Sequence, residues 1–547
     1  MQHYFKSLES AIKNNWSAPG IGTYQAEDFT YGEVATFIER FHILMEAAGV
    51  KKGQKVALCA KNSGRWAIAY LGINTYEAVV VPILDNFTPE NINSLVDHSE
   101  SVMLFTNKDL WAKLDIEKMP NICGVVGMED FGMLYAKDET VKAAFENLDA
   151  NFAAKHPDGF GPKDICFPEG NDKDLAVINY TSGSTGNPKG VMLRYESFSA
   201  MVDFAQRVLP CGPGDTIMSM LPMAHMYGMV FDFLFPVCCG VHVRFFGKTP
   251  SPTLLLKAMK EVRPFMVLSV PLVMEKIYKS SIKPVLEKPA MKILTKIPVV
   301  NGIIYKKVGA KICEAFGGNV KHFIMGGAPL NPEAEAVFKK IGLPYTVGYG
   351  MTEACPLLAY EDNHRYVQGS CGKKIDVCDL RIDSEDPQHI AGEIQAKGMN
   401  VCMGYFNNEE ASANAFTEDG WLRTGDLGII DANNNVFIRG RSKSMILSAN
   451  GQNIYPEEVE AIVNNQSYVA ESVVVDRSTK LVALVYLDAD KMKADGLDDE
   501  AIADVPEKVR TAANRQLPNY SQITKVEVVS APFEKTPKMS IKRFLYK

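Results

Sequence analysis

The sequence predicts an α/β protein with a large N-terminal domain and a small α+β C-terminal domain. The chain has 547 residues, well beyond the ~250–300 at which a single hydrophobic core stops growing. Short apolar runs alternate with amphipathic, helix-like runs, which is typical of βαβ units with largely parallel sheets. Around Gly440 a turn-rich β region gives way to a compact α+β pattern. We therefore expect two domains, residues 1–440 and 441–547.

The clearest strand signals are four short apolar runs in the N-terminal part of the chain. They are Lys55–Ala60, Ala78–Leu84, Val102–Thr106 and Leu175–Tyr180. Because these runs alternate with amphipathic helix-like runs, they favour βαβ units. In the turn-rich region, Asp431–Asn435 predicts a tight turn, because Asp and Asn side chains hydrogen-bond to their own backbone.

A longer apolar stretch, Met226–Val243, is interrupted only by Asp232 and His242 and approaches the length of a membrane span. Pro236, Gly240 and the central acid argue against spanning, so we expect a buried core helix followed by a strand. Farther along, Lys279–Lys307 is basic and contains three prolines, which predicts a loop plus a short helix.

Composition indicates an ordinary soluble protein, with 46% hydrophobic and 22% charged residues. The net charge of −7 argues against nucleic acid as a partner, because phosphate binding needs a basic surface. The 11 cysteines are scattered without zinc-site spacing, and the polar N-terminus is not expected to be a signal peptide. We expect reduced thiols and a cytoplasmic location; the oligomeric state stays open.

The strongest local signal is the loop YTSGSTGNPKG, from Tyr180 to Gly190, directly after an apolar run. Glycines let backbone N–H groups approach an anion, hydroxyls donate hydrogen bonds and lysine adds charge, so the loop predicts polyphosphate binding. A Walker A loop is disfavoured, because Lys189 is followed by Gly190 rather than by Ser or Thr. The candidate phosphate-binding residues are Thr181, Ser182, Gly183, Ser184, Thr185, Gly186 and Lys189.

This loop resembles the phosphate-binding signature of the adenylate-forming superfamily, which includes acyl-CoA synthetases, adenylation domains and luciferases. Further segments follow in the family's order: LPMAHMYG at 221–228, GGAPL at 326–330, YGMTE at 349–353, WLRTGDLG at 421–428, RGRSK at 439–443 and SANGQNIYPEEVE at 448–460. The chain looks most like bacterial medium- and long-chain fatty-acid–CoA ligases. The resemblance implies a small β-barrel region in the large domain and a mobile C-terminal domain, with the hinge near Lys443.

The resemblance assigns roles where the acid would react. His225 would lie beside the substrate carboxylate, Thr352 would bind the α-phosphate and Glu353 would hold Mg²⁺. Magnesium favours hard oxygen ligands, usually one or two carboxylates plus phosphates. The helix after His225 would line the acyl pocket with Met226, Met229, Val230 and Phe233.

The resemblance also assigns the nucleotide contacts. Adenine would pack against Gly327, Ala328, Tyr349 and Gly350. Asp426 would accept hydrogen bonds from both ribose hydroxyls, and Arg441 would contact the ribose as well.

The chain departs from the family pattern at a catalytic lysine near the C-terminus. Aligning Thr536 and Arg543 with the family's T-x-x-G-K-x-x-R puts Ser540 at the lysine position. Three interpretations are open: Lys538 reaches the site from two residues earlier, Lys542 does so from two residues later, or adenylation is partly lost. We take Lys538 as the candidate catalytic lysine.

The resemblance implies ATP-dependent conversion of a carboxylic acid, a medium- or long-chain fatty acid, to acyl-AMP and then to acyl-CoA. ATP, Mg²⁺ and CoA are the expected cofactor and co-substrates, and Gly451 would sit near the pantetheine tunnel. An aromatic acid could occupy a similar pocket.

Two alternatives are a stand-alone enzyme that loads a carrier protein and a nucleotide- or acyl-binding paralogue with impaired catalysis. A hydrolase is disfavoured because no GxSxG is present. Transient membrane contact stays open.

Overall fold

The computed structural model describes residues 2–181, 188–248, 252–298, 300–447, 453–477, 480–535 and 541–546. Its largest sheet has the strand order β7-β6-β5-β3-β4-β8-β9. Pairing is parallel from β6 to β8 and antiparallel at both edges. The strands are β3 (Lys55–Cys59), β4 (Val79–Ile83), β5 (Met103–Thr106), β6 (Gly124–Gly127), β7 (Met133–Ala136), β8 (Leu175–Thr181) and β9 (Lys189–Arg194). The four predicted strands are therefore confirmed as β3, β4, β5 and β8.

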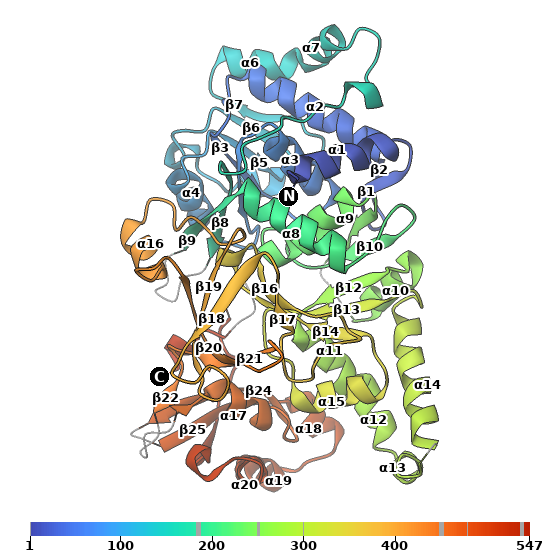
Figure 1. Cartoon of the computed structure of the whole chain (residues 1–547), viewed down its shortest axis with the longest axis vertical. Helices are drawn as coiled ribbons and strands as arrows, with labels where there is room; N and C mark the ends of the chain where they lie inside the picture. The colour runs from blue at the N-terminus through green and yellow to red at the C-terminus, as the bar shows by residue number, and fades with distance from the viewer. Residues whose placement is uncertain are drawn as a thin grey trace.

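Two hydrophobic cores lie against this sheet and are formed with its covering helices. The helices are α1 (Tyr4–Asn14), α2 (Tyr31–Ala47), α3 (Gly64–Thr75), α4 (Pro89–His98), α6 (Glu139–Glu146), α7 (Leu148–Lys155) and α8 (Tyr195–Val208). The second helix begins at Tyr31 because Thr30 and Glu33 form a capping box. Helices α6 and α7 pack against α2 at the top of the view in Figure 1.

Two smaller sheets complete the α/β part. One has the order β10-β11-β1-β2 and the other the order β12-β13-β14, and only β2 runs antiparallel. Their strands are β1 (Pro19–Thr23), β2 (Asp28–Thr30), β10 (Thr216–Ser219), β11 (His242–Phe245), β12 (Met266–Ser269), β13 (His322–Met325) and β14 (Tyr345–Val347). Helices α10 (Pro252–Val262), α11 (Pro271–Ile277) and α15 (Pro332–Lys340) connect them.

The apolar stretch after residue 226 forms the π-helix η3 (Gly228–Leu234), the short helix α9 (Phe235–Cys238) and then strand β11. The buried core helix and the following strand are thus confirmed. The wide π-helical turn is a detail that the sequence does not predict. Among the described residues, no helix is long and apolar enough to cross a membrane.

Antiparallel strands make up the region after residue 349. Three of them, β15 (Tyr349–Gly350), β16 (Leu357–Tyr360) and β17 (Lys373–Lys374), form one small sheet. The other four, β18 (Cys378–Asp383), β19 (Gly392–Gly398), β20 (Leu422–Ile430) and β21 (Val436–Arg441), form a second. A bridge between Lys373 and Asn435 joins the two sheets, which occupy the region where a small β-barrel is expected. The predicted turn at Asp431 is confirmed, since its carboxylate accepts hydrogen bonds from the backbone of Asn433 and Asn435.

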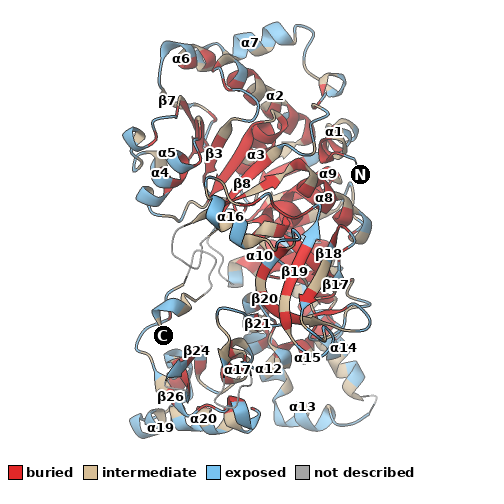
Figure 2. Ribbon diagram, turned by 60° about the vertical axis from the view of Figure 1, so that its left-hand side comes forward, coloured by how far each residue is buried: buried red, intermediate tan, exposed pale blue. Residues whose placement is uncertain are grey.

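The C-terminal residues build an α+β unit around a core of its own. Its sheet has the order β24-β25-β26, with a two-stranded ribbon β22-β23 beside it. The elements are β22 (Ile446–Leu447), β23 (Asn453–Ile454), α17 (Pro456–Val463), β24 (Val469–Arg477), β25 (Lys480–Leu487), α18 (Ala489–Ala494), α19 (Asp499–Ala503), α20 (Val505–Asn514) and β26 (Lys525–Val528). In Figure 2 the red, buried strands of the large domain contrast with the paler outer helices of this unit.

The basic stretch around residue 290 is more helical than predicted. It contains the π-helix η4 (Tyr278–Ile282), the short helices α12 (Lys283–Leu286) and α13 (Pro289–Leu294), and the long helix α14 (Val300–Ala315). Pro284 and Pro289 lie at helix starts, where the missing N–H costs nothing, so they begin helices instead of interrupting them.

Candidate active site

The carboxylate of Asp426 contacts side chains from two other strands, Tyr349 and Arg441. Asp426, on β20, is 4% exposed. Its Oδ2 accepts a hydrogen bond of 2.7 Å from the Tyr349 hydroxyl, and its Oδ1 lies 2.7 Å from Nε of Arg441. Burial raises the pKa of Asp426, while Arg441 and Tyr349 oppose that shift. A carboxylate has about four acceptor positions, so this one can accept further donors.

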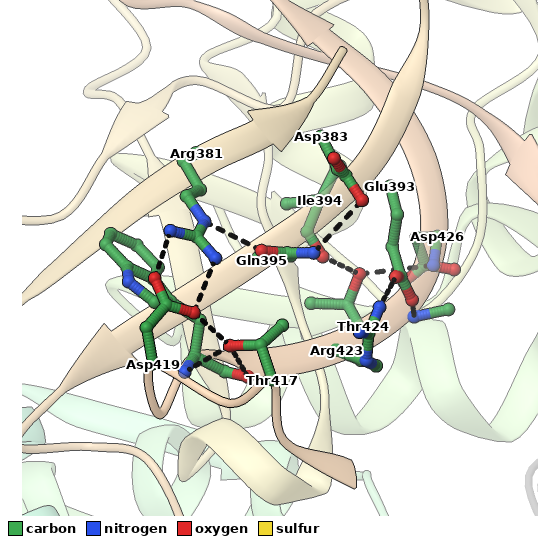
Figure 3. Close-up of polar contacts among 12 residues, drawn as sticks. Arg381, Asp383, Glu393, Ile394, Gln395, Thr417, Asp419, Arg423, Thr424 and Asp426 are labelled. Carbon is green, nitrogen blue, oxygen red and sulfur yellow. Dashed lines mark hydrogen bonds and ion pairs between the residues drawn. The ribbon is translucent and has the colours of Figure 1, made fainter. Parts of the chain in front are cut away.

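The backbone around Asp426 is held by hydrogen bonds that Figure 3 draws. The Thr424 hydroxyl donates to the Ile394 carbonyl at 2.7 Å and accepts the Asp426 N–H at 3.1 Å. Between them, Gly425 has φ of 71°, a left-handed conformation that favours glycine, and its N–H donates to Glu393 at 3.1 Å. The Thr-Gly-Asp sequence is thus a bulged turn within a strand that aims the carboxylate at Tyr349.

The three other predicted adenine contacts, Gly327, Ala328 and Gly350, differ in their surroundings. At Gly350 an added Cβ would come within 1.8 Å of the Pro356 carbonyl oxygen, so only glycine fits between the paired strands. Gly327 and Ala328 lie in an exposed turn after β13, and Gly327 has φ of 84°. That turn and the Tyr349 strand adjoin, because the Gly348 N–H donates to the Met325 carbonyl at 2.8 Å.

A tyrosine that the motifs did not indicate links the phosphate loop to Glu353. The Tyr405 hydroxyl donates to Glu353 Oε1 at 2.9 Å. Nζ of Lys189 lies 5.1 Å from the centroid of the same ring, within cation–π range. Tyr405 therefore contacts both a candidate magnesium ligand and a candidate phosphate-binding cation.

Backbone pairing fixes this arrangement. Residues 402–406 run beside β9: the Phe406 N–H donates to Gly190 at 2.8 Å, and Met192 donates to Gly404 at 3.0 Å. At the other end, the Cys402 N–H donates to the Glu353 carbonyl at 2.8 Å. We call residues 402–406 the strap. It joins strand β9, which starts at Lys189, to the turn that carries Glu353.

The turn with Thr352 and Glu353 is a short 3₁₀ helix, η5 (Thr352–Ala354). Buried Asn400 holds it by donating to the carbonyls of Ala354 and Leu357, at 3.0 and 2.7 Å. Thr352 is 9% exposed and Glu353 is half-buried. Among the described residues, no group of three or more His, Cys, Asp or Glu could hold a metal ion. A single carboxylate suits Mg²⁺ that is bound mainly by a substrate's phosphates.

His225 is half-buried and lies at the start of η3, where its carbonyl accepts the Met229 N–H at 2.9 Å. The four predicted pocket-lining residues, Met226, Met229, Val230 and Phe233, are all buried within the main core. The Phe233 ring packs edge-on against the rings of Tyr70 and Phe245.

One buried acid stands out in η3. Asp232 has no exposed surface, and its Oδ2 accepts hydrogen bonds from the Ser219 hydroxyl and from the N–H groups of Met220 and Leu221, at 3.2–3.3 Å. Its Oδ1 has no hydrogen-bond partner among the described residues. Burial raises the pKa of Asp232 to about 7. The acid ties the π-helix to the strand end that leads into the His225 segment.

Several predicted residues lie outside the described part of the chain. They are Ser182, Gly183, Ser184, Thr185 and Gly186 of the phosphate loop, Gly451, Lys538 and Ser540. Thr181 and Lys189, at the two ends of the phosphate loop, are opposite each other in the β8–β9 pair. Lys542, the alternative to Lys538, lies 3.4 Å from the Glu534 carboxylate. Arg543 forms an ion pair with buried Glu460.

Sequence reasoning missed Tyr405 and did not assign a hydrogen-bonding role to Asp232. Tyr405 carried no recognised motif, and only the pairing of the strap with β9 places it beside Glu353. Asp232 was noticed as an interruption of an apolar stretch. An acid in such a stretch is a signal of a buried, hydrogen-bonded role.

Most of the chain matches two protein-family models. The model of the AMP-binding enzyme family matches residues 12–406, and that of the AMP-binding enzyme C-terminal domain matches residues 443–546. The chain belongs to the AMP-binding enzyme family. Tyr349, Glu353 and His225 fall within the first match, whereas Asp426 and Arg441 lie in the segment between the two matches.

Characterised relatives of this AMP-binding enzyme span most of its length. Long-chain-fatty-acid–CoA ligase FadD15 of Mycobacterium bovis is 27% identical, with 94% of this chain and 90% of the relative covered. The peroxisomal long chain acyl-CoA synthetase 6 of Arabidopsis thaliana is 29% identical, with 85% and 69% covered. Human long-chain-fatty-acid–CoA ligase 1 is 27% identical, with 89% and 74% covered.

Solved structures share the fold over the whole chain. ATP-bound MatB from Rhodopseudomonas palustris superposes with a TM-score of 0.75 at 22% identity, covering 100% of this chain and 98% of that one. The anthranilate CoA ligase AuaEII, in complex with anthranoyl-AMP, gives 0.79 at 17% identity, with 99% and 96% covered. These structures support the predicted α/β architecture with its large and small domains.

Proposed function

We propose that this AMP-binding enzyme is an ATP-dependent acid–thiol ligase that converts a long-chain fatty acid to its acyl-CoA through an acyl-adenylate. The observation that carries the nucleotide part is the carboxylate of Asp426, buried between Tyr349 and Arg441 with acceptor capacity left over. The full-length similarity to ligases named for long-chain fatty acids supports the substrate class. The apolar surroundings of η3 agree with an aliphatic acid.

The residues of the nucleotide end bind and orient ATP in this proposal. Asp426 accepts the ribose hydroxyls, and the Tyr349 ring packs on adenine. Lys189 and Thr181, at the ends of the phosphate loop, face the phosphates. Positioning and electrostatic stabilisation supply most of the rate acceleration that we attribute to the protein.

The reaction has two displacements. First, a carboxylate oxygen of the acid attacks the α-phosphorus, the bond to the β-phosphate oxygen breaks, and pyrophosphate leaves. Then the CoA sulfur attacks the acyl carbonyl, the carbon–oxygen bond to AMP breaks, and AMP leaves as the thiol gives up its proton. Glu353 would hold Mg²⁺, which supplies charge neutralisation at the phosphates. Tyr405 keeps the Glu353 carboxylate in place through its hydrogen bond.

We propose a domain division between residues 440 and 441, with a pivot near Lys443. The separate core of the C-terminal unit supports it. The contacts across the division include the ion pair of Arg441, the last residue of β21, with Asp426, and the contacts of Arg439 with Glu458 at 3.6 Å and of Lys279 with the Asn464 carbonyl at 3.0 Å. We further propose a cytoplasmic location, in keeping with 11 cysteines that are all free thiols.

The test is one assay on the purified protein with Mg·ATP and a panel of short-, medium- and long-chain fatty acids and aromatic acids. Pyrophosphate release and acyl-CoA formation are recorded separately, with and without CoA. We expect pyrophosphate release without CoA and acyl-CoA formation that is highest with long-chain acids. Pyrophosphate without acyl-CoA would indicate a carrier protein as acceptor. ATP binding without turnover would indicate an impaired paralogue, and Ser540→Lys would then be the next variant.

A further inference from the structure

The most basic segment of this acidic protein is the helical arm that projects at the lower right of Figure 1. We define the basic arm as residues 276–311, which comprise η4, α12, α13 and most of α14. It contains nine lysines and a single acidic residue, Glu287, although the whole chain has a net charge of −7. Positive charge is therefore concentrated on one projection of a negatively charged molecule.

The base of the arm is firmly packed. Gly309 of α14 lies so close to the end of α15 that an added Cβ would come within 2.0 Å of the Ile341 carbonyl oxygen. Lys283 pairs with Glu333 at 2.9 Å, and Tyr278 packs edge-on against Phe338. The arm is thus held in a fixed direction relative to the large domain.

The tip of the arm is exposed and apolar as well as basic. Ile293 is 66% exposed, Ile303 is 53% exposed and Ile297 is 43% exposed, and Leu294 and Val285 are exposed as well. Single exposed aliphatic side chains are ordinary, but a cluster of them at one projecting end marks an interaction surface. Figure 2 shows α13 in pale blue at the outer end of the molecule.

The lysines at the tip are available to a partner. Lys288, Lys292, Lys296, Lys306 and Lys307 are exposed, and none of them has an ion pair with any residue that the structure describes. Basic side chains around exposed aliphatic ones are typical of segments that bind an anionic lipid surface, where the lysines meet phosphates and the aliphatic side chains enter the acyl boundary.

We propose that the tip of the basic arm docks this enzyme on anionic phospholipid membranes. A flat anionic surface attracts the arm and repels the rest of the acidic chain, so the charge distribution also sets the orientation of the bound enzyme. The docking site would bring an enzyme of the proposed function to a membrane in which long-chain acids dissolve. Docking itself depends only on the arm.

The test is flotation of the full-length protein with phosphatidylcholine vesicles that contain or lack phosphatidylglycerol, without ATP, acid or CoA. We expect at least roughly tenfold more binding to the anionic vesicles, because each lysine near an anionic surface contributes to the attraction. Binding should decrease as salt is raised, because salt screens these charges. Since no turnover is measured, failure of this proposal is distinguishable from failure of the proposed function.

Two variants separate charge from apolar contact. Lys288→Glu with Lys292→Glu and Lys296→Glu is expected to abolish vesicle binding, and Ile293→Ser with Ile297→Ser is expected to weaken it severalfold. The matched charge control is Lys113→Glu with Lys118→Glu and Lys163→Glu, three exposed lysines elsewhere on the large domain. The matched apolar control is Val367→Ser with Ile390→Ser, which are 40% and 55% exposed.

Thermal unfolding checks that each variant is folded. Equal binding of the arm variants and their controls would overturn the proposal, as would equal binding to neutral and anionic vesicles. Concentration-dependent self-association that the Ile293→Ser, Ile297→Ser variant removes, without vesicle binding by the unmodified protein, would identify a second copy of the chain as the occupant and would also overturn it.

Discussion

The nucleotide end and the acyl end of the site each contain a buried aspartate, and the two are treated differently. Asp426 has a cation, Arg441, and a hydroxyl, Tyr349, on separate oxygens. Asp232 has no cation: one oxygen accepts three hydrogen bonds and the other has no partner among the described residues. The first is placed to receive a ligand, whereas the second holds a π-helix to a strand. The charge of Asp426 should therefore affect nucleotide binding, and the charge of Asp232 should affect the stability of the fold.

The largest effect is expected at the nucleotide end. Asp426→Ala removes the proposed ribose acceptor and leaves the buried Tyr349 hydroxyl and the exposed Arg441 guanidinium without their shared partner, so kcat/KM for ATP should fall by roughly 10²–10³. Pyrophosphate release at varied ATP measures it. The matched control is Asp419→Asn in the turn before β20, where the exposed ion pair with Arg381 should matter by no more than about twofold. Equal effects of the two substitutions would break the comparison.

A smaller effect, on the Mg²⁺ requirement, is expected at Tyr405, which contacts both Glu353 and Lys189. Tyr405→Phe keeps the ring beside Lys189 but removes the hydrogen bond to Glu353, so the Mg²⁺ concentration for half-maximal rate should rise by roughly three- to tenfold. Glu353→Gln should raise it further. A purely structural role for Tyr405 would change the melting temperature without changing the Mg²⁺ requirement.

The double variant sharpens this test. If Tyr405 acts through Glu353, Tyr405→Phe should have little further effect on the Mg²⁺ requirement once Glu353→Gln is present. Tyr360→Phe is the control, because the buried Tyr360 hydroxyl has no hydrogen-bond partner among the described residues. Additive effects of Tyr405→Phe and Glu353→Gln would contradict the assigned positioning role.

At the acyl end we expect an effect on stability instead of turnover, and this effect depends on pH. A folded pKa of about 7 for Asp232, above an unfolded value of ~3.9, means that the folded state retains a proton that the unfolded state has lost. The associated stability is full below about pH 4 and is lost as pH rises through about 7. Asp232→Asn cannot ionise, so its stability relative to the unmodified protein should increase by about 3 kcal/mol between about pH 5 and about pH 8.

Urea unfolding of both proteins across this pH range measures the difference. Asp426→Asn serves as the comparison, because the folded carboxylate there is compensated by Arg441 and its pH dependence should be weaker. Parallel stability profiles for Asp232→Asn and the unmodified protein would show that Asp232 does not titrate in this window.

The sequence predicted the regular parts of the fold well because their signals are local. Apolar runs that are buried on both faces gave β3, β4, β5 and β8, and Asp431 gave its turn. It did not predict the π-helix, since an apolar stretch that is buried all round has no periodicity to read. For the basic arm the sequence predicts a loop, because its prolines are taken as helix breakers. A proline at the first turn of a helix is tolerated, and the sequence alone does not show where each helix starts.

The candidate site was predictable where motifs carry it. Tyr349, Asp426 and Arg441 were each indicated by a motif, and the structure brings the three together across 92 positions of sequence, from 349 to 441. Tyr405 could not be predicted, because its place beside Glu353 depends on the pairing of the strap with β9. Asp232 could be noticed but not interpreted, because its partners lie on the preceding strand end.

The central claim is that the acid attacks the α-phosphate of ATP. The most direct measurement uses a long-chain fatty acid with ¹⁸O in both carboxylate oxygens, in a complete reaction with Mg·ATP and CoA, followed by mass spectrometry of the products. The account predicts one ¹⁸O atom in AMP and none in pyrophosphate, because the carboxylate oxygen stays on phosphorus when the thiol displaces AMP. Formation of ADP with labelled phosphate, or of AMP without label, would contradict it.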